Sequence, residues 1–294
     1  MPQPPYIELQ KVSKKFGKNL VLDNIDLSIP FGEITGIIGA SGSGKTTILN
    51  LLIGFYKQTS GKIKFQGRDI HKDYQNISMI FGFATQGGSF YNELSVEENL
   101  CYFGKLYNLS LKEIKSRADN LLRLLELENA RKFLARSLST GMQRRLDIAC
   151  ALIHNPKVLI LDEPTEDLDP LLRREVIEVL KRVKNTGTTI ILTSHLLGEI
   201  ENLCDKIAIL HKGRIMKFDS PATLKKLYGK NSLEEIFISI IKEGDKLIAK
   251  TLVSSALQQS AQKSSVKSNI SRNKSLEKGE DFQKNKGFTF WKKK

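Results

Sequence analysis

The sequence has few cysteines, a single tryptophan and no long apolar run. Its 294 residues contain only three cysteines, Cys101, Cys150 and Cys204, which lie far apart and form no C-x-x-C motif. Such a scattered, odd-numbered set argues against a disulfide framework and against a cysteine zinc site. We therefore expect three reduced cysteines that serve mainly as packing residues.

The sequence also shows no membrane-crossing segment and no targeting segment. No stretch approaches the roughly 18 consecutive apolar residues that span a bilayer, and residues 1–6 lack the apolar run of a signal peptide. The hydrophobic fraction of 40% is ordinary for a globular protein, and the length allows one large domain or a domain with an appendage. We expect a cytoplasmic protein, unless another protein holds it at a membrane.

The positive charge is concentrated near the C-terminal end. The chain has a net charge of +14, and residues 251–294 carry ten Lys and Arg against three Asp and Glu. The same stretch is rich in Ser, Asn and Gln, so it is predicted to stay disordered. Its final residues, 288–294, mix aromatics with lysines. They are interpreted either as a contact with an anionic membrane face or as a solvated tail. No specific nucleic acid is expected, because no nucleic-acid-binding motif is present.

The most informative motif is a glycine-rich loop of the form G-x-x-x-x-G-K-[ST], which covers residues 39–46. It follows the apolar run 34–38 and leads into the helical pattern of residues 46–53. This strand–loop–helix context predicts a phosphate-binding loop, in which backbone N–H groups and a helix N-terminus surround an anion. Lys45 is placed to reach the β- and γ-phosphates of a nucleotide, and the Thr46 hydroxyl to bind Mg²⁺.

The hydrophobic periodicity predicts an α/β fold. Continuous apolar runs at 34–38, 158–161 and 189–192 are typical of buried parallel strands. They alternate with helical patterns at 46–53, 171–183 and 196–203, which is the rhythm of a doubly wound sheet. Segments 6–12, 22–29 and 61–65 alternate apolar and polar residues and predict a small antiparallel sheet. Between 93 and 153 the pattern becomes purely helical, with a helix predicted over 111–127.

A second motif follows the predicted strand at 158–161. Asp162 and Glu163 lie at its carboxyl end, where ligands bind in open α/β sheets. Asp162 is placed to hold Mg²⁺, and Glu163 to accept a proton from an attacking water. By itself the pair also fits a strand exit with two solvated acids, but together with the phosphate loop the functional interpretation is favoured.

Further motifs follow in a fixed order. Residues 138–145 read Leu-Ser-Thr-Gly-Met-Gln-Arg-Arg, which resembles the signature motif of ABC-type ATPases, usually written LSGGQ. Gln86 resembles the Q-loop glutamine of that family, Asp169 its D-loop aspartate and His195 its switch histidine. The resemblance covers roughly residues 5 to 220. It implies a P-loop NTPase core of RecA-like type, with the small antiparallel β subdomain and an inserted α-helical subdomain.

The resemblance also implies roles for individual residues. Glu163, His195 and Lys45 are implied in catalysis, and Thr46, Gln86 and Asp162 in holding magnesium. Ser139 and Gly141 are implied to bind the γ-phosphate of a nucleotide on the opposite subunit, so that two chains enclose two ATP molecules. Phe16 occupies the place of an adenine-stacking aromatic, although it also fits a core Phe at a strand end. The residues implied in nucleotide binding are Phe16, Gly39, Ala40, Ser41, Gly42, Ser43, Gly44, Lys45, Thr46, Thr47, Gln86, Ser139, Gly141 and Asp169.

Three positions depart from the usual family pattern. Thr140 replaces the first glycine of the signature, Met142 replaces its glutamine, and Asp167 stands where many D-loops have glycine. This form resembles the ATPases of ABC-2-type exporters. Since Ser139 and Gly141 are retained, we expect both nucleotide sites to hydrolyse ATP.

Other polar residues have simpler interpretations. The pair Arg144 and Arg145 fits a phosphate or RNA contact, but a solvated helix face or an intersubunit ion pair is favoured. His71, His154 and His211 lie in no motif and are expected to be surface or packing residues.

The sequence thus predicts an ATP- and Mg²⁺-dependent subunit of an ABC transporter with a nucleotide-binding domain over 5–228. Within this domain, the helical subdomain covers about residues 93–153. A helical extension over 229–250 and a basic tail over 251–294 follow the domain. The expected partners are a second copy or a paralogue and a transmembrane permease that holds the chain at the cytoplasmic face of the membrane, with export favoured. The alternatives are a soluble ABC ATPase without transport function and an ATP-dependent regulatory module. Two-domain translation ATPases are disfavoured because one phosphate loop is present. DNA-repair ATPases are disfavoured because the interval from Gln86 to Ser139 is too short for a coiled coil.

Overall fold

A computed structural model describes residues 5–72, 79–85 and 87–246 of the chain. The chain divides into two compact units, 1–240 and 241–294. In the second unit only 241–246 are described, and they are helical. The basic tail, residues 247–250 of the expected extension and Gln86 lie outside the described residues.

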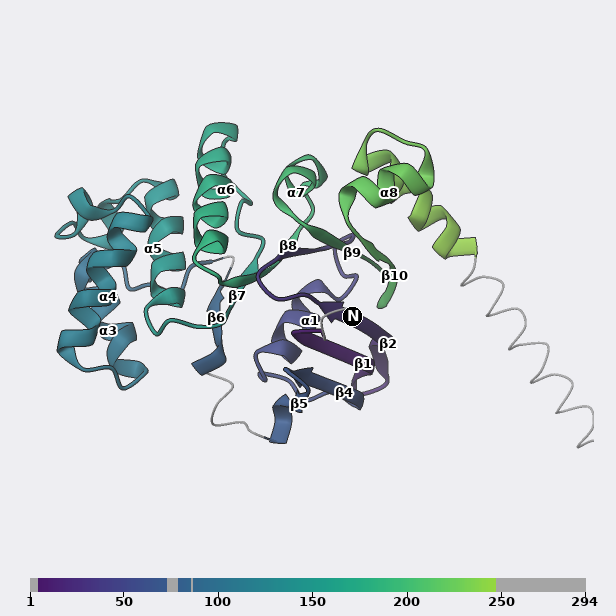
Figure 1. The fold of residues 1–294 in the computed structure, drawn as a ribbon, viewed down its shortest axis with the longest axis horizontal. Coiled ribbons are helices and arrows are strands. Elements are labelled where there is room, and N and C mark those ends of the chain that lie inside the picture. The colour runs from purple at the N-terminus through teal and green to yellow at the C-terminus, as the bar shows by residue number, and fades with distance from the viewer. Residues whose placement is uncertain (1–4, 73–78, 86, 247–294) are drawn as a thin grey trace, which may run out of the picture. The chain divides into compact units, whose positions relative to one another are not determined.

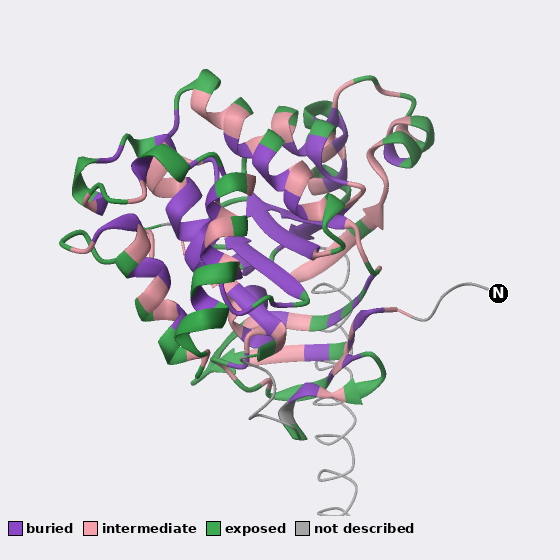
Figure 2. Cartoon of the chain, turned by 60° about the vertical axis from the view of Figure 1, so that its left-hand side comes forward, coloured by how far each residue is buried: buried purple, intermediate pink, exposed green. Residues whose placement is uncertain are grey.

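The larger sheet has six strands and forms the centre of the first unit (Figures 1 and 2). Its strand order is β10-β9-β3-β8-β7-β6, and all neighbours are parallel except β10, which runs antiparallel to β9. The strands are β3 (Ile34–Ile38), β6 (Phe81–Ala84), β7 (Val158–Asp162), β8 (Thr189–Ser194), β9 (Lys206–His211) and β10 (Arg214–Asp219). The three buried parallel strands expected from the sequence are therefore confirmed, with β8 two residues longer than predicted.

Helices cover both faces of this sheet. Successive strand side chains point to opposite faces, so Ile38 lies in the apolar cluster that contains residues of α6 (Pro170–Asn185), whereas Ile37 lies in the cluster that contains residues of α1 (Lys45–Leu52). Figure 1 shows α6 and α7 on one face and α1 on the opposite one. The helices around the sheet are α1 (Lys45–Leu52), α6 (Pro170–Asn185), α7 (Leu197–Leu203) and α8 (Pro221–Tyr228). This layered arrangement confirms the predicted α/β fold.

A smaller antiparallel sheet packs beside α1. Its order is β2-β1-β4-β5. The strands are β1 (Ile7–Phe16), β2 (Asn19–Ile29), β4 (Ser60–Phe65) and β5 (Arg68–Asp69). Ile7, Leu9, Ile25 and Ile63 are buried against α1, while intervening residues face outward, as the alternating pattern predicted.

Three helices lie between β6 and β7 along the chain (Figure 1). They are α3 (Val96–Leu106), α4 (Leu111–Leu124) and α5 (Thr140–Leu152), with short 3₁₀ segments at Glu128–Ala130 and Ala135–Ser137. The third, α5, contacts both α3 and α6. It therefore joins this helical region to the α/β core.

The α4 helix is shorter than predicted. Capping boxes begin both α3 and α4, where Ser95 pairs with Glu98 and Ser110 with Glu113. The sequence predicted that the second helix continues to residue 127, but it ends at Leu124. The reason is local, because Glu126 adopts a left-handed conformation with φ of 56° that no α-helix accommodates. Among the described residues, no helix combines the length and the apolar composition needed to cross a bilayer.

Candidate functional site

The phosphate-binding loop connects β3 to α1, as its sequence context predicted. Gly42 and Gly44 have φ of 74° and 109°, a region in which a side chain is strained. Gly39 has no room for a side chain, because a Cβ there would lie 2.5 Å from the Leu210 carbonyl oxygen. No side chain caps the first turn of α1, so its backbone N–H groups face the loop.

The remaining loop residues differ in exposure. Ala40, Ser41 and Gly42 are exposed at the rim, and Thr47 is half-buried on α1. Ser43 is buried, and its hydroxyl has no hydrogen-bond partner within the described part of the chain. A buried polar atom without a partner is unfavourable unless a ligand satisfies it. The loop therefore has the donors and the geometry for an anion.

Lys45 lies over this loop with its side chain largely buried. Its Nζ donates to the Gly39 carbonyl oxygen at 3.1 Å and lies 3.4 Å from Glu163 Oε1. The ammonium is thus held between the start of the phosphate loop and the end of β7. A charge in this position is ready to meet a phosphate group.

Hydrogen bonds between side-chain oxygen atoms link α1, β7 and β8. Thr46 Oγ1 donates to Asp162 Oδ2 at 3.0 Å, and Thr193 Oγ1 donates to Asp162 Oδ1 at 2.5 Å. Hydroxyl and carboxylate oxygens at this spacing are the hard ligands that Mg²⁺ prefers. Thr46 and Asp162 therefore fit a magnesium ion, and Thr193 fixes the orientation of the carboxylate.

Glu163 occupies the centre of the site. Its backbone has φ of 50° and its amide donates to Thr193 Oγ1 at 3.0 Å, so a strained residue is held at the end of β7. Its Oε2 lies 2.6 Å from His195 Nδ1. Burial raises the pKa of Glu163, but hydrogen bonds from Glu166 and His195 and the charge of Lys45 outweigh this effect, and the net pKa is lowered. The carboxylate is therefore ionised at neutral pH and can accept a proton.

Glu166 joins this group and was not among the predicted site residues. One ligand atom each of Glu163, Glu166 and His195 lies within 4.8 Å of the others. Burial, the hydrogen bond to Glu163 and the negative charge of Glu163 raise the pKa of Glu166. Thr193 was missed too, although its position at the end of a predicted strand was a usable signal.

The signature and D-loop residues form a second group. Ser139 is exposed at the N-cap of α5, where its hydroxyl accepts from Met142 N at 3.3 Å. Asp169 is the N-cap of α6 and accepts from Leu171 N and Leu172 N. The two helix starts pack together, since a Cβ at Gly141 would lie 2.7 Å from Leu172.

Phe16 is not a core residue. Its side chain is 40% exposed, with the ring edge-on to Tyr56 at 5.0 Å and Lys14 Nζ 4.7 Å from its centroid. The exposure is compatible with a ring that receives a ligand and argues against the alternative of a buried strand-end Phe. Gln86 cannot be placed in the site, because it lies outside the described residues.

The expectation of a solvated face for the arginine pair was wrong. Arg145 is buried and bonds to Glu126 at 3.0 Å and to Glu175, while Arg144 donates to the Thr85 carbonyl oxygen at 3.0 Å. Both guanidinium groups are therefore used inside the chain, and not on a solvated face. A buried charge is retained in a fold only when it is paired in this way.

Two of the histidines are packing residues, as expected. His154 stacks on Tyr107 with ring centroids 3.7 Å apart, and burial lowers its pKa to about 4. His211 is buried at the end of β9. Of the free cysteines, Cys150 and Cys204 are buried and Cys101 is half-buried.

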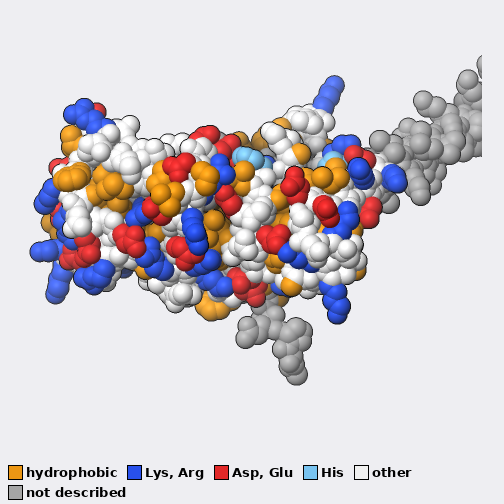
Figure 3. Space-filling view, turned by 90° about the horizontal axis from the view of Figure 1, so that it is seen from above, with side chains coloured by type: hydrophobic (Ala, Val, Ile, Leu, Met, Phe, Trp, Pro, Cys, Tyr) orange, Lys and Arg blue, Asp and Glu red, His pale blue; other side chains and the backbone are white. Residues whose placement is uncertain are grey.

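One face of the molecule carries charges of both signs. On the face shown in Figure 3, basic and acidic side chains are interspersed.

Comparison with known proteins assigns the same region to one family. Residues 22–166 match the sequence profile of the family described as ABC transporter. The chain is 36% identical over 233 residues to the lantibiotic transport ATP-binding protein SrtF of Streptococcus pyogenes, covering 79% of this chain and 95% of that protein. It is 32% identical to the linearmycin resistance ATP-binding protein LnrL of Bacillus subtilis, covering 84% and 79% of the two chains.

A longer relative and a solved structure are also similar to this chain. The chain is 37% identical to ABC transporter G family member 23 of Dictyostelium discoideum over 85% of its own length, but it spans only 35% of that longer protein. The solved structure of cbiO1 from Clostridium perfringens, part of the ABC transporter complex cbiONQ, superposes with a TM-score of 0.71. It is 28% identical and covers 77% of this chain and 92% of that one.

Proposed function

Because this chain belongs to the ABC transporter ATP-binding proteins, which bind and hydrolyse ATP, we propose that it is the nucleotide-binding subunit that drives a separate membrane permease in export. The observation that carries the proposal is the convergence of Lys45, Glu163 and His195 beside Thr46 and Asp162. These groups come from the carboxyl ends of β3, β7 and β8, where α/β sheets bind their ligands.

The phosphate loop binds the triphosphate in this proposal. Gly39 to Thr47 surround the β- and γ-phosphates with backbone N–H groups, and Lys45 neutralises part of their charge. Thr46 and Asp162 hold Mg²⁺, which when bound neutralises phosphate charge and orients the γ-phosphate. Gln86 is proposed as a further magnesium ligand, and Phe16 as the surface on which adenine stacks.

Glu163 activates the water that attacks the γ-phosphate. Its ionised carboxylate accepts the proton and is held between Lys45 and His195. His195, exposed at the end of β8, contacts the γ-phosphate and stabilises the charge that develops during transfer.

The second group of residues serves a nucleotide bound to another chain. Ser139 and Asp169 are exposed at the N-termini of α5 and α6. A helix N-terminus carries partial positive charge and attracts a phosphate. Two chains therefore close head to tail on two ATP molecules, with Ser139 and Gly141 of each facing the γ-phosphate of the other.

The names of the relatives support a role in transport. SrtF is named for lantibiotic transport and LnrL for linearmycin resistance, and cbiO1 is described as part of a transporter complex. We propose that a permease holds this chain at the cytoplasmic face of the membrane and that the basic residues 251–294 contact anionic lipid there.

The proposal is tested by affinity capture with the Glu163→Gln variant from detergent-solubilised native membranes. With ATP present the variant is expected to stay closed on its nucleotide and to co-purify with a protein of several membrane spans. Capture without nucleotide is the matched control and should retain less of it. Recovery of ribosomes, of DNA-repair factors or of the chain alone would contradict the transporter role and favour a soluble ABC ATPase.

A further inference from the structure

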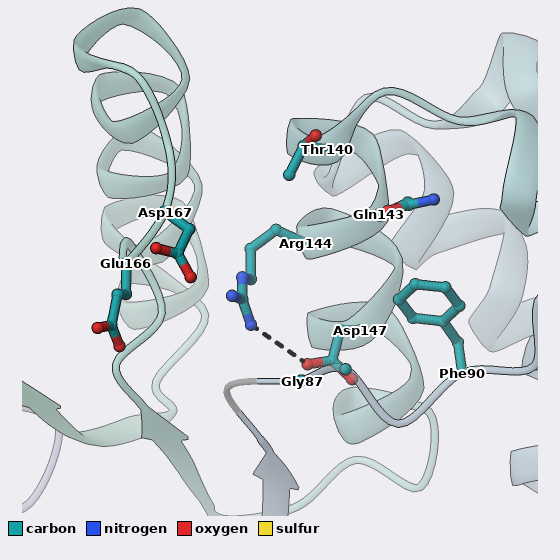
Figure 4. Close-up of a pocket in the computed structure, with 9 residues that line it drawn as sticks. Gly87, Phe90, Thr140, Gln143, Arg144, Asp147, Glu166 and Asp167 are labelled. Atoms are coloured by element: carbon teal, nitrogen blue, oxygen red, sulfur yellow. Dashed lines mark ion pairs between the residues drawn. The ribbon is translucent and has the colours of Figure 1, made fainter.

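A buried ion pair on α5 holds the segment that follows β6. Arg144 Nη1 donates to the Thr85 carbonyl oxygen at 3.0 Å and lies 3.9 Å from Asp147 Oδ2. Asp147 Oδ1 accepts from the Ser89 amide at 2.7 Å. Figure 4 shows Arg144 extending from α5, with the ion pair to Asp147 as a dashed line. Two side chains of one helix thus contact the backbone on both ends of residues 85–89.

Both side chains are withdrawn from water. Asp147 is 1% exposed and the Arg144 side chain 12% exposed. Removing two charges from water costs free energy that their mutual attraction does not fully offset. A helix that served only for packing would be more stable with apolar residues at these positions. The pair is therefore better explained by what it positions than by what it contributes to stability.

The pair lies where three functional segments meet. A cavity of about 210 Å³ beside it is lined by three groups of residues. Gly87, Gly88 and Phe90 come from the segment after β6, Thr140 and Gln143 from α5, and Glu166 and Asp167 from the loop before α6. Figure 4 shows Arg144 projecting from α5 toward the loop that carries Glu166 and Asp167.

We propose that Arg144 and Asp147 are positioning residues that fasten Thr85 and Ser89 to α5, so that the end of β6 and the start of α5 move as one body during ATP turnover. Ser139 caps α5 and Arg144 lies less than two helical turns further on. A displacement at the end of β6 therefore reaches Ser139 through hydrogen bonds and one short stretch of rigid helix. This inference rests on the proposed function, in which Ser139 contacts a nucleotide on the opposite chain.

The test compares Arg144→Ala, Asp147→Ala and the double variant of the full chain. Each single variant is expected to lower the kcat of ATP hydrolysis about 10-fold, because a small misplacement of a catalytic part has effects of this size or larger. The double variant should lose no more than either single one, since both residues act in one connection. The KM for ATP should change less than about 2-fold, because neither residue contacts the phosphate loop.

Amide hydrogen exchange adds a structural readout that does not depend on activity. Exchange of the Ser89 amide should accelerate in Asp147→Ala, which removes its acceptor. Asp147→Asn keeps an acceptor oxygen and should keep the amide protected while losing the attraction to Arg144. Arg144→Lys retains one donor for the Thr85 carbonyl and should partly restore kcat relative to Arg144→Ala.

Asp119→Ala is the matched control. Asp119 pairs with Arg131 within the helical region and contacts neither Thr85 nor Ser89. It should leave both kcat and Ser89 exchange as in the wild type. A wild-type kcat in Asp147→Ala, or losses in the two single variants that multiply in the double one, would overturn the proposal. Full activity of Glu163→Gln would instead contradict the proposed chemistry, and the exchange result would remain interpretable.

Discussion

The phosphate-loop group and the signature group are built in different ways. Around the phosphate loop, Glu163 pairs with both Lys45 and His195, which come from segments far apart in the chain. At the signature, Ser139 and Asp169 bond only to the first turns of their own helices among the contacts described above. The first group therefore consists of charged side chains that pair with one another, whereas the second consists of two capped helix N-termini.

The difference indicates how the work would be divided between the two copies of the proposed head-to-tail dimer. The charges of Lys45 and Glu163 are largely buried and are stable there only with partners, which the same chain provides. Capped helix ends need no partner to fold and can stay exposed until a phosphate meets them. Substitutions in the first group should accordingly abolish chemistry, and those in the second should weaken it.

The largest effect is expected for Glu163→Gln. Turnover should fall at least about 100-fold, because general base catalysis is lost, while ATP binding is retained, because Lys45 and the phosphate loop are unchanged. Phosphate release and equilibrium nucleotide binding measure the two properties. Glu178→Gln, which alters an exposed pair with Lys181, is the control. A fully active Glu163→Gln would remove Glu163 as the base.

A smaller effect is expected for Ser139→Ala, which tests the second group. Loss of the N-cap should cost about 1 kcal/mol of unfolding free energy, and loss of a phosphate donor should lower turnover about 10-fold. Ser110→Ala removes the equivalent cap of α4. It should show the loss in urea unfolding but normal turnover, and equal turnover losses in both variants would contradict the assignment.

Asp147→Asn should reveal how much the buried carboxylate lowers the free energy of unfolding at neutral pH. Burial raises the pKa of Asp147 from 3.8 to about 6, although the Ser89 amide and Arg144 act in the opposite direction. A carboxyl whose pKa is raised in the folded state stabilises the fold below pH 4 and loses that contribution as the pH rises through 6. At pH 7.5 the variant should therefore be more stable than the wild type, by at most about 3 kcal/mol. Urea unfolding at pH 4.5 and 7.5 measures this difference, which should shrink at the lower pH.

The smallest effect is expected for Thr140→Gly. Thr140 begins α5 where the family signature has glycine, and it restricts the loop in front of the helix. A glycine there should raise the steady-state rate, by about 2-fold at most, since glycine relaxes the backbone. A rate identical to that of the wild type would dispose of the idea that Thr140 slows turnover.

Most of the α/β framework could be predicted from the sequence, because buried parallel strands are continuous apolar runs. Three strands of the larger sheet escaped prediction. β6 (Phe81–Ala84) is short and contains a glycine, and β9 and β10 extend the opposite edge of the sheet. The phosphate loop was predictable because its residues are contiguous in the sequence and because phosphate binding explains each residue type in the motif. Thr193 and the inward-facing Arg144 were missed, because their partners come from other segments of the chain. Glu166 is only three residues from Glu163, but its sequence position does not show that both side chains turn toward His195.

The amino-acid sequence by itself determined the family, the α/β class of the fold and the phosphate loop, since these depend on local spacing and periodicity. Only the tertiary structure decided which side chains meet. It placed Thr193 on Asp162, Glu166 beside Glu163, and the Asp147 carboxylate on the Ser89 amide. Such contacts are set by the register of neighbouring strands and by helix packing, which no short stretch of sequence specifies.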